Sequence, residues 1–246
     1  YLQGLHNDFL QAKGESRYGR VIEISANRGR ITDRHGEVLA VSTPVKSIWA
    51  IPGEAKLDRT QLAQLAALLE MPPEEIRKRI EESGRDFAYV KRQIPPEVAE
   101  RVAELGIPGL FQNREYRRYY PGGEVMAHVL GFTGAEDAGQ EGVELAFQSH
   151  LAGKPGSRRV IRDRLGQIVE DVEGIRAAQE GRDLRLALDA RVQSLAFSQL
   201  KAAVDQHRAK AGGIVVLDVT TGEVVALANL PTYNPNNRAR LSGAQL

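Results

Sequence analysis

Residues 26–40 read ANRGRITDRHGEVLA. Within this stretch, Arg30-Ile31-Thr32 has the β-branched character of a short strand, and the apolar run Val38-Leu39-Ala40-Val41 has the character of a second. Asp33-Arg34-His35-Gly36 lies between them and supplies a turn, because glycine takes a positive φ without steric cost. These residues predict an antiparallel pair of strands in the first part of the chain.

Further elements are expected on both sides of this pair. A helix is expected over Leu2–Phe9, with Gly14 as its stop. Residues 107–182 are rich in glycine and proline and read mainly as turns. Apolar spacing predicts three short helices, at 61–69 after Thr60 as N-cap, at 72–84 and at 95–106. Strands are predicted at 21–24, 47–51, 87–90, 159–161 and 167–169.

Beyond residue 183 the pattern changes. Leu186–Asp189 leads into a long amphipathic helix, whose apolar positions run from Val192 to Val204. Near-continuous apolar runs at 213–219 and 223–228 then predict a hairpin about Thr221-Gly222, with strands that are covered on both faces. We therefore place a domain boundary near residue 183, and we expect an α+β fold.

Composition excludes several classes of function. The chain has no cysteine, so it has no disulfides, thiolate metal sites or cysteine nucleophiles. Its 33 basic and 32 acidic residues give a net charge of +1, which argues against a nucleic-acid-binding protein. The five histidines lack the spacing of metal ligands and no P-loop is present, so neither a metal nor a cofactor is expected. No run of 18 apolar residues predicts a membrane span.

One short motif suggests acyl transfer by a serine. The residues from Ser198 to Lys201 fit S-x-x-K, in which the lysine lies one helical turn from a nucleophilic serine. A penicillin-recognising site also needs a K-T-G or K-S-G strand, and the nearest string, Lys210-Ala211-Gly212, lacks the hydroxyl. Ser198 also lies midway along a predicted surface helix rather than at its start. We therefore interpret Ser198 and Lys201 as a chance match without a catalytic role.

Four blocks of sequence, which we call the signature blocks, resemble class B penicillin-binding proteins in their content and order. They are residues 26–40, quoted above; RYYPGG at 118–123 with HVLG at 128–131; GVELAF at 142–147; and 214–236, which contains TGE at 221–223 and ends in PTYNPN. The closest resemblance is to the division-specific (septal) peptidoglycan D,D-transpeptidase of Gram-negative bacteria.

The resemblance implies a fold and an activity. Residues 1–182 are expected to form an elongated, non-catalytic pedestal of short strands and helices. Residues 183–246 are expected to form the first helix and β-hairpin of an incomplete transpeptidase fold. The family's nucleophilic S-x-x-K follows shortly after PTYNPN, so this chain is expected to stop before it and to be inactive alone. The whole protein is expected to cross-link peptidoglycan stem peptides and to be a target of β-lactams.

The resemblance also implies a location and partners. A membrane helix is expected to precede Tyr1 and to hold the protein on the periplasmic side of the bacterial inner membrane. The pedestal is expected to dock the peptidoglycan glycan polymerase and small bitopic division proteins. Stem peptides and β-lactams are expected to bind only through the missing catalytic domain, and no nucleic acid is expected to bind.

The signature residues are expected to shape the backbone rather than to do chemistry. Gly29 and Gly36 permit tight turns, and Asp33 can accept backbone N–H bonds within its turn. Arg28 or Arg34 can pair with a carboxylate such as Glu144. The full structural set is Arg28, Gly29, Asp33, Arg34, Gly36, Arg118, Tyr120, Pro121, Gly142, Glu144, Asp218 and Gly222.

Three alternative hypotheses stay open from the sequence alone. The chain could be the pedestal of the elongation-specific class B paralogue, a stand-alone interaction module, or a serine hydrolase that uses Ser198. The apolar strands at 213–228 argue against the module, because they read as part of a larger catalytic fold. The chain beyond residue 183 is expected to be marginally stable unless another chain or the rest of the domain covers these strands.

Overall fold

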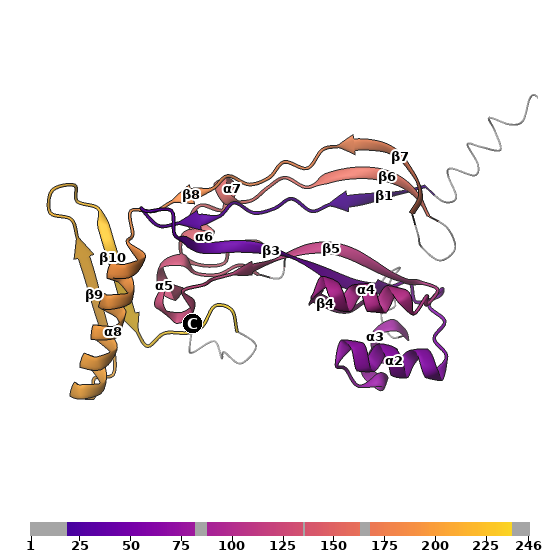
Figure 1. Cartoon of the computed structure of the whole chain (residues 1–246), viewed down its shortest axis with the longest axis horizontal. Coiled ribbons are helices and arrows are strands. Elements are labelled where there is room, and N and C mark those ends of the chain that lie inside the picture. Colours follow the sequence, from indigo (N-terminus) through magenta and orange to yellow (C-terminus); the bar gives the residue numbers. More distant parts are fainter. Residues whose placement is uncertain (1–18, 82–87, 135, 163–167, 238–246) are drawn as a thin grey trace, which may run out of the picture. The chain divides into compact units, whose positions relative to one another are not determined.

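The structure of the chain is a computed structural model, which describes residues 19–81, 88–134, 136–162 and 168–237 (Figure 1). The helix predicted over Leu2–Phe9 lies outside the described residues. Short strands and helices alternate along the described chain, and this mixture confirms the predicted α+β class.

The described residues divide into two compact units, and each unit is built from separate stretches of the chain. The first unit draws on residues within 1–25, 44–116 and 155–178. The second unit draws on residues within 26–43, 117–154 and 179–246. Each unit is described below by itself.

Three antiparallel strands form a sheet in the first unit, in the order β1-β6-β7. They are β1 (Gly19–Ile24), β6 (Gly156–Arg162) and β7 (Ile168–Arg176). β6 is the central strand and pairs with both neighbours in antiparallel register. The strand predicted before residue 25 and the two predicted between 159 and 169 are thereby confirmed.

Three helices and a strand give the first unit its hydrophobic core. The elements are α2 (Arg59–Leu69), α3 (Pro73–Glu81), β4 (Ala88–Ile94) and α4 (Pro96–Glu104). All four were predicted, although β4 continues beyond the expected 87–90. The core consists of Ile48, Ala50, Leu62, Leu65, Ala66, Leu69, Ile76, Ile80, Val90, Ile94, Ala99, Val102 and Ile107.

The N-cap predicted for α2 was wrong by two residues. Asp58, rather than Thr60, caps the helix, because its carboxylate accepts a hydrogen bond from the Gln61 N–H at 2.7 Å. The Gln61 side chain in turn accepts from the Asp58 N–H at 3.2 Å, which completes a capping box. Thr60 has alanine three residues later, so it lacks the partner that such a box requires.

One long strand replaces two predicted ones. β3 runs over Val38–Ala50, whereas the sequence predicts separate strands at 38–41 and 47–51. The beginning of β3 pairs with β2 (Ile31–Thr32), and its end pairs with β4. Pro44, which has no N–H to give to a ladder, lies between these two paired stretches, so the backbone can stay extended through it.

Sequence analysis missed β5 (Leu110–Tyr119), which pairs with β3. The buried residues of β5 are Phe111, Glu115 and Arg118. Two of these three are charged, so the alternation of apolar and polar residues is hidden and the stretch reads as loop. Short helices in the same expected loop region were also missed: η1 (Gly123–Val125), α5 (Ala127–Leu130), α6 (Gly142–Ala146) and α7 (Gln148–Leu151).

The core of the second unit draws together all four signature blocks. β2 lies between the start of β3 and β8 (Leu184–Arg185), which runs parallel to it. Val143 of the third block packs against this core without being fully buried. The buried members are Ile31, Leu39, Ala40, Tyr120, Met126, Ala127, Leu130, Phe132, Leu151 and Tyr233.

The long helix and the hairpin predicted after residue 183 are confirmed. They are α8 (Ala190–His207), β9 (Gly212–Leu217) and β10 (Val224–Leu230), and the two strands are antiparallel. On the inner face of the helix, Phe197 and Leu200 pack against Ala228 of β10.

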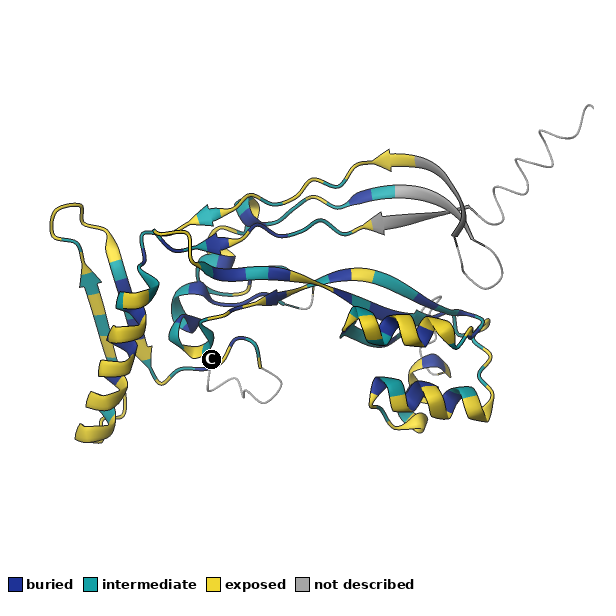
Figure 2. Cartoon of the chain, in the orientation of Figure 1, coloured by how far each residue is buried: buried dark blue, intermediate teal, exposed yellow. Residues whose placement is uncertain are grey.

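Only one face of this hairpin is covered by the described residues, although the apolar strands predict two covered faces. Alternate residues of β9 are exposed, as Figure 2 shows, and Val215 and Leu217 are 60% and 55% exposed. Val224 at the start of β10 is also exposed. The sheet therefore presents an apolar face without a packing partner in the described chain.

The one-sided packing predicts low local stability for β9. In this chain alone, hydrogen exchange at the amides of β9 should be roughly tenfold or more faster than at the start of β3, because weakly packed strands open more readily. Hydrogen–deuterium exchange followed by mass spectrometry measures both stretches in one sample. Equal and strong protection of β9 and β3 in the monomer would contradict the prediction.

Candidate functional site

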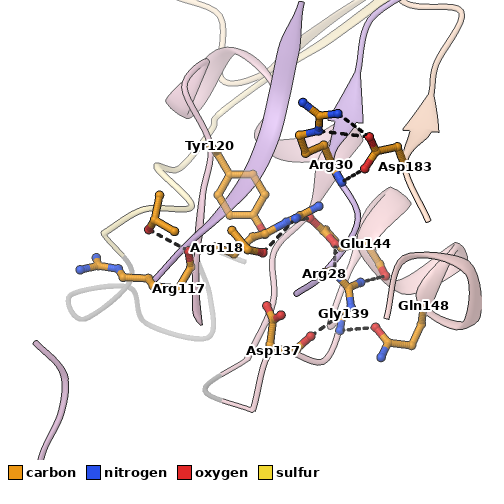
Figure 3. Close-up of polar contacts among 12 residues, drawn as sticks. Arg28, Arg30, Arg117, Arg118, Tyr120, Asp137, Gly139, Glu144, Gln148 and Asp183 are labelled. Carbon is orange, nitrogen blue, oxygen red and sulfur yellow. Dashed lines mark hydrogen bonds and ion pairs between the residues drawn. The ribbon is translucent and has the colours of Figure 1, made fainter. Parts of the chain in front are cut away.

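Glu144 holds two arginine side chains inside the second unit (Figure 3). Its Oε2 accepts a hydrogen bond from Arg28 Nε at 2.7 Å, and its Oε1 accepts one from Arg118 Nε at 2.7 Å. The Glu144 side chain is fully buried, and both arginine side chains are only 1% exposed. We call these three residues the buried triad. Each charge needs the others, because an unpaired charge in the interior is strongly destabilising.

Further hydrogen bonds fix both guanidinium groups. Arg28 donates from Nη1 to the backbone oxygen of Asp137 at 3.0 Å and from Nη2 to the backbone oxygen of Glu144 at 2.9 Å. Arg118 donates from Nη1 to Ser42 Oγ at 3.1 Å. The triad thus joins the segment before β2, the end of β5, helix α6 and strand β3.

Of the two arginines predicted to pair with a carboxylate such as Glu144, Arg28 pairs with it, whereas Arg34 has a different partner. Arg34 Nη2 lies 2.6 Å from Oε2 of Glu223, which belongs to the last signature block. Arg118 was singled out by its motif without a specific contact, and the structure makes it the second cation on Glu144. The first three signature blocks therefore meet in the buried triad.

The two glycines of the first signature block serve different purposes. A Cβ atom on Gly29 would lie 1.9 Å from the backbone oxygen of Arg182, so this position requires glycine for the close approach of two backbones. The turn predicted at Gly29 is therefore not the reason for its presence. Gly36 has a φ of +90° and open space around it, so it meets the turn requirement that the sequence predicts.

Asp137 adds a second carboxyl group beside the triad. Its burial raises the pKa to about 6, and the charge of Glu144 acts in the same direction. The positive charges of Arg28 and Arg118 oppose this rise without cancelling it. The carboxyl oxygen Oδ1 is buried without a hydrogen-bond partner among the described residues. Asp137 thus titrates near neutral pH within a cluster of fixed charges.

Asp33 connects the first signature block to the start of α8. Its Oδ1 accepts hydrogen bonds from the N–H groups of His35 and Glu37, both at 2.8 Å, which confirms the predicted turn contacts. Its Oδ2 accepts from the N–H of Ala190 at 3.1 Å. Burial acts to raise the pKa of Asp33, but these backbone hydrogen bonds outweigh it and hold the pKa below the usual value.

Ion pairs on the surface surround this connection. His35 Nε2 lies 3.1 Å from Oδ2 of Asp189, whose Oδ1 also caps α8 by accepting from the N–H groups of its first turn. Arg30 pairs with Asp183 at 2.8 Å, and both side chains are at least half exposed. Exposed pairs of this kind contribute little stability individually. Their positions nevertheless show that residues 30–35 repeatedly contact residues 183–190.

The PTYNPN segment returns to the second signature block. The side chain of Asn236 accepts from the N–H of Tyr120 and donates to its C=O, both at 2.9 Å. The Tyr233 side chain lies in the core, and its hydroxyl donates to Glu141 Oε2 at 2.9 Å. Residues 233–236 are therefore fastened to the same core as the first signature block.

The remaining signature residues shape turns. Gly142 has a φ of +58°, and a Cβ there would meet the Gly131 nitrogen at 2.7 Å. Asp218 accepts hydrogen bonds from two N–H groups of the β9–β10 turn, and Gly222 closes this turn with a φ of +74°. Pro121 is exposed beside the buried Tyr120, whose pKa is raised by its burial.

The structure places Ser198 and Lys201 on the exposed side of α8. Ser198 Oγ donates to the backbone oxygen of Leu195 at 2.9 Å. Lys201 Nζ lies 3.8 Å from a carboxyl oxygen of Glu124. Each polar group thus has a partner other than its neighbour in the S-x-x-K string, which supports our interpretation of that string as a chance match.

The contacts described above hold separate segments of the chain together. Within the described ranges, no group of three histidine, aspartate or glutamate side chains is placed to hold a metal ion. No helix in these ranges is both long and apolar enough to cross a membrane.

Sequence reasoning missed Ser42, Asp137 and Gln193. The last of these lies among the apolar positions of α8, and a polar residue at such a position is the signal that could have revealed it.

Comparison with known families identifies the family of this chain. The model of the penicillin-binding protein dimerisation domain matches residues 23–186, the stretch that contains the buried triad and Asp33. The chain belongs to this family. Its predicted resemblance to class B penicillin-binding proteins is thereby confirmed.

Relatives with assigned names match nearly the whole chain. It is 43% identical over 249 residues to the probable peptidoglycan D,D-transpeptidase PenA of Neisseria gonorrhoeae, covering 100% of this chain and 43% of that protein. It is 42% identical over 245 residues to the peptidoglycan D,D-transpeptidase FtsI of Escherichia coli K12, covering 96% of this chain and 41% of that protein. The chain therefore spans about two fifths of the length of these relatives.

Solved structures share the fold. Penicillin-binding protein 2X of Streptococcus thermophilus matches with a TM-score of 0.62 and 23% identity, over 90% of this chain and 37% of its own. Penicillin-binding protein PBP2 of Helicobacter pylori, solved in complex with MreC, matches with a TM-score of 0.64 and 23% identity, over 89% of this chain and 44% of its own. These likenesses confirm the predicted fold.

Replacing Glu144 should strongly destabilise the second unit. The Glu144→Ala change leaves two buried arginines without their carboxylate, so we expect the free energy of unfolding to fall by about 3–5 kcal/mol. The matched control is Glu223→Ala, which removes a half-exposed partner of Arg34 and should cost less than about 1 kcal/mol. Urea unfolding of the three proteins measures both changes. Similar small losses for both variants would contradict the role of the triad.

Asp137 should make stability depend on pH. Its pKa is about 6 in the folded chain against an ordinary value of 3.8, so the folded state holds the proton more tightly. This contribution is fully present below about pH 3.8 and is lost as the pH rises through 6.

Wild type should therefore lose about 1–3 kcal/mol relative to Asp137→Asn between pH 4 and pH 8, at about 1.4 kcal/mol for each unit of pKa. Urea unfolding of both proteins at the two pH values measures the difference. A gain in the stability of wild type relative to the variant over this interval would show that the arginines outweigh burial.

Proposed function

We propose that this chain is the pedestal, with the beginning of the catalytic domain, of a septal peptidoglycan D,D-transpeptidase. The identities to PenA and FtsI extend over almost the entire chain, which supports an activity of this class for the whole protein. We place the boundary near residue 183, close to the end of the family match at residue 186. On this proposal residues 1–182 are the pedestal and residues 183–246 begin the transpeptidase fold.

The observation that carries the role of the chain is the hydrogen bond from the N–H of Ala190 to Asp33. It joins the signature turn of the pedestal to the first turn of α8 across the proposed boundary. The pairs of Arg34 with Glu223 and of His35 with Asp189 cross the same boundary. The pedestal would thus hold the first helix and hairpin of the catalytic domain in a fixed position.

The reaction belongs to the whole protein, and its serine follows residue 236 on this proposal. The serine oxygen attacks the carbonyl carbon of the D-Ala-D-Ala bond, the terminal D-Ala leaves with a proton, and an acyl-enzyme forms. An amine of a second stem peptide then attacks this ester, which forms the cross-link and returns the proton to the serine. A β-lactam would be attacked in the same way and would remain attached. The chemistry requires no cofactor.

We further propose that the pedestal faces the periplasm, beside an inner membrane that an N-terminal helix would cross. Its partners would be the glycan polymerase and small bitopic division proteins. The PBP2 of Helicobacter pylori was solved in complex with MreC, which supports protein docking by a related fold. Rescue of septation or of elongation in depleted cells by the full-length protein distinguishes the septal role from that of the elongation paralogue.

Labelling with fluorescent penicillin tests the proposed activity. The full-length protein should be labelled covalently, and its Ser198→Ala variant should be labelled to the same extent, because Ser198 lies outside the proposed site. The 246-residue chain alone should not be labelled. Labelling of this chain that is abolished by Ser198→Ala would instead support the serine hydrolase hypothesis. A full-length protein that is not labelled would overturn the proposed activity.

A further inference from the structure

The side chain of Gln193 makes three hydrogen bonds inside the second unit. The residue lies in α8 and is fully buried. Its Nε2 donates to the backbone oxygens of Val125 and Leu227, both at 2.8 Å. Its Oε1 accepts from the N–H of Leu227 at 2.8 Å. Both amide protons and the carbonyl oxygen of the side chain therefore take part in hydrogen bonds.

Through these bonds the side chain replaces a neighbouring strand along one edge of β10. Leu227 gives both its N–H and its C=O to the Gln193 amide, as it would to the backbone of an adjacent strand. Two residues earlier, the C=O of Val225 accepts from the N–H of Asp189 at 2.9 Å. The start of α8 therefore closes one edge of β10, while the other edge pairs with β9.

The third bond connects this edge to the second signature block. Val125 belongs to η1, which begins at Gly123, the last residue of the RYYPGG motif at 118–123. β10 then runs directly into PTYNPN, whose Asn236 is bonded to Tyr120 of the same block. One amide thus fixes the helix, the strand and the signature block at a point that lies just before the PTYNPN segment.

We propose that Gln193 is a positioning residue for acyl transfer by the whole protein. The inference rests on the proposed function, in which the nucleophilic serine follows residue 236. Gln193 sets the path of β10 and hence the position from which the chain continues toward that serine. An apolar side chain of the same size would fill the space but would leave Leu227 and Val125 without partners, so β10 would move.

The test uses the full-length protein and fluorescent penicillin as the probe. The variants are Gln193→Leu, Gln193→Glu and the matched control Gln199→Leu, which changes an exposed glutamine of the same helix. The second-order acylation rate is measured at 15 °C and divided by the folded fraction from circular dichroism, so that lost stability does not enter. We expect Gln193→Leu to be acylated at least about tenfold more slowly, because small misplacements reduce rates strongly. The control should match wild type.

Gln193→Glu separates positioning from mere stability. A buried glutamate has a raised pKa, so its carboxyl is protonated at pH 5.5 and can again donate and accept, whereas at pH 8 the carboxylate only accepts. Its acylation rate relative to wild type should therefore recover severalfold from pH 8 to pH 5.5. If Gln193→Leu fails to fold, the change with pH in the acylation rate of Gln193→Glu relative to wild type tests the inference by itself.

Two results would overturn the inference while leaving the proposed function intact. They are a folded Gln193→Leu variant with the wild-type acylation rate, and a Gln193→Glu variant whose relative rate does not change with pH. A wild-type protein that is not labelled at all would overturn the proposed function, and this inference with it.

Discussion

Burying Glu144 beside Arg28 and Arg118 constrains the paths of three segments of the chain. The partners are 116 and 26 residues away from Glu144 in sequence, and none of the three side chains can be left alone in the interior. Apolar side chains accept many neighbours, whereas a carboxylate that binds two guanidinium groups accepts very few arrangements. The apolar core around Ile31 and Leu130 can therefore pack with these three segments in only one relative arrangement. Any other arrangement would separate the buried charges of the triad.

The elements that could be predicted are those whose apolar residues alternate or recur at helical spacing. Helix α8 and the β9–β10 hairpin are examples, because most of their inward residues are apolar. β5 could not be found in this way, since Glu115 and Arg118 take two of its buried positions. The opposite error was to predict two strands where β3 is continuous. Its pairing changes near Pro44, from β2 to β4, but the strand does not end there.

The candidate site was predictable to the extent that short motifs contain its residues. Motif blocks placed Arg28, Arg118 and Glu144 among the structural residues, and the charges of Arg28 and Glu144 suggested their pairing. The position of Asp137 beside them depends on how a loop folds over the triad, which local sequence does not reveal. Gln193 could have been noticed as a polar residue among the apolar positions of α8, but its partners are backbone atoms, which the sequence does not identify.

The hydrogen bond between Asp33 and Ala190 has a consequence for the order in which the protein can be completed. These residues are 157 positions apart. At a synthesis rate of about 5–20 residues per second, the signature turn waits roughly 10–30 s for this partner. Arg28 waits for Glu144 during much of the same interval. The signature turn is therefore stabilised late, and the nascent chain carries the unmatched charges of Arg28 and Asp33 until residues 144 and 190 have been made.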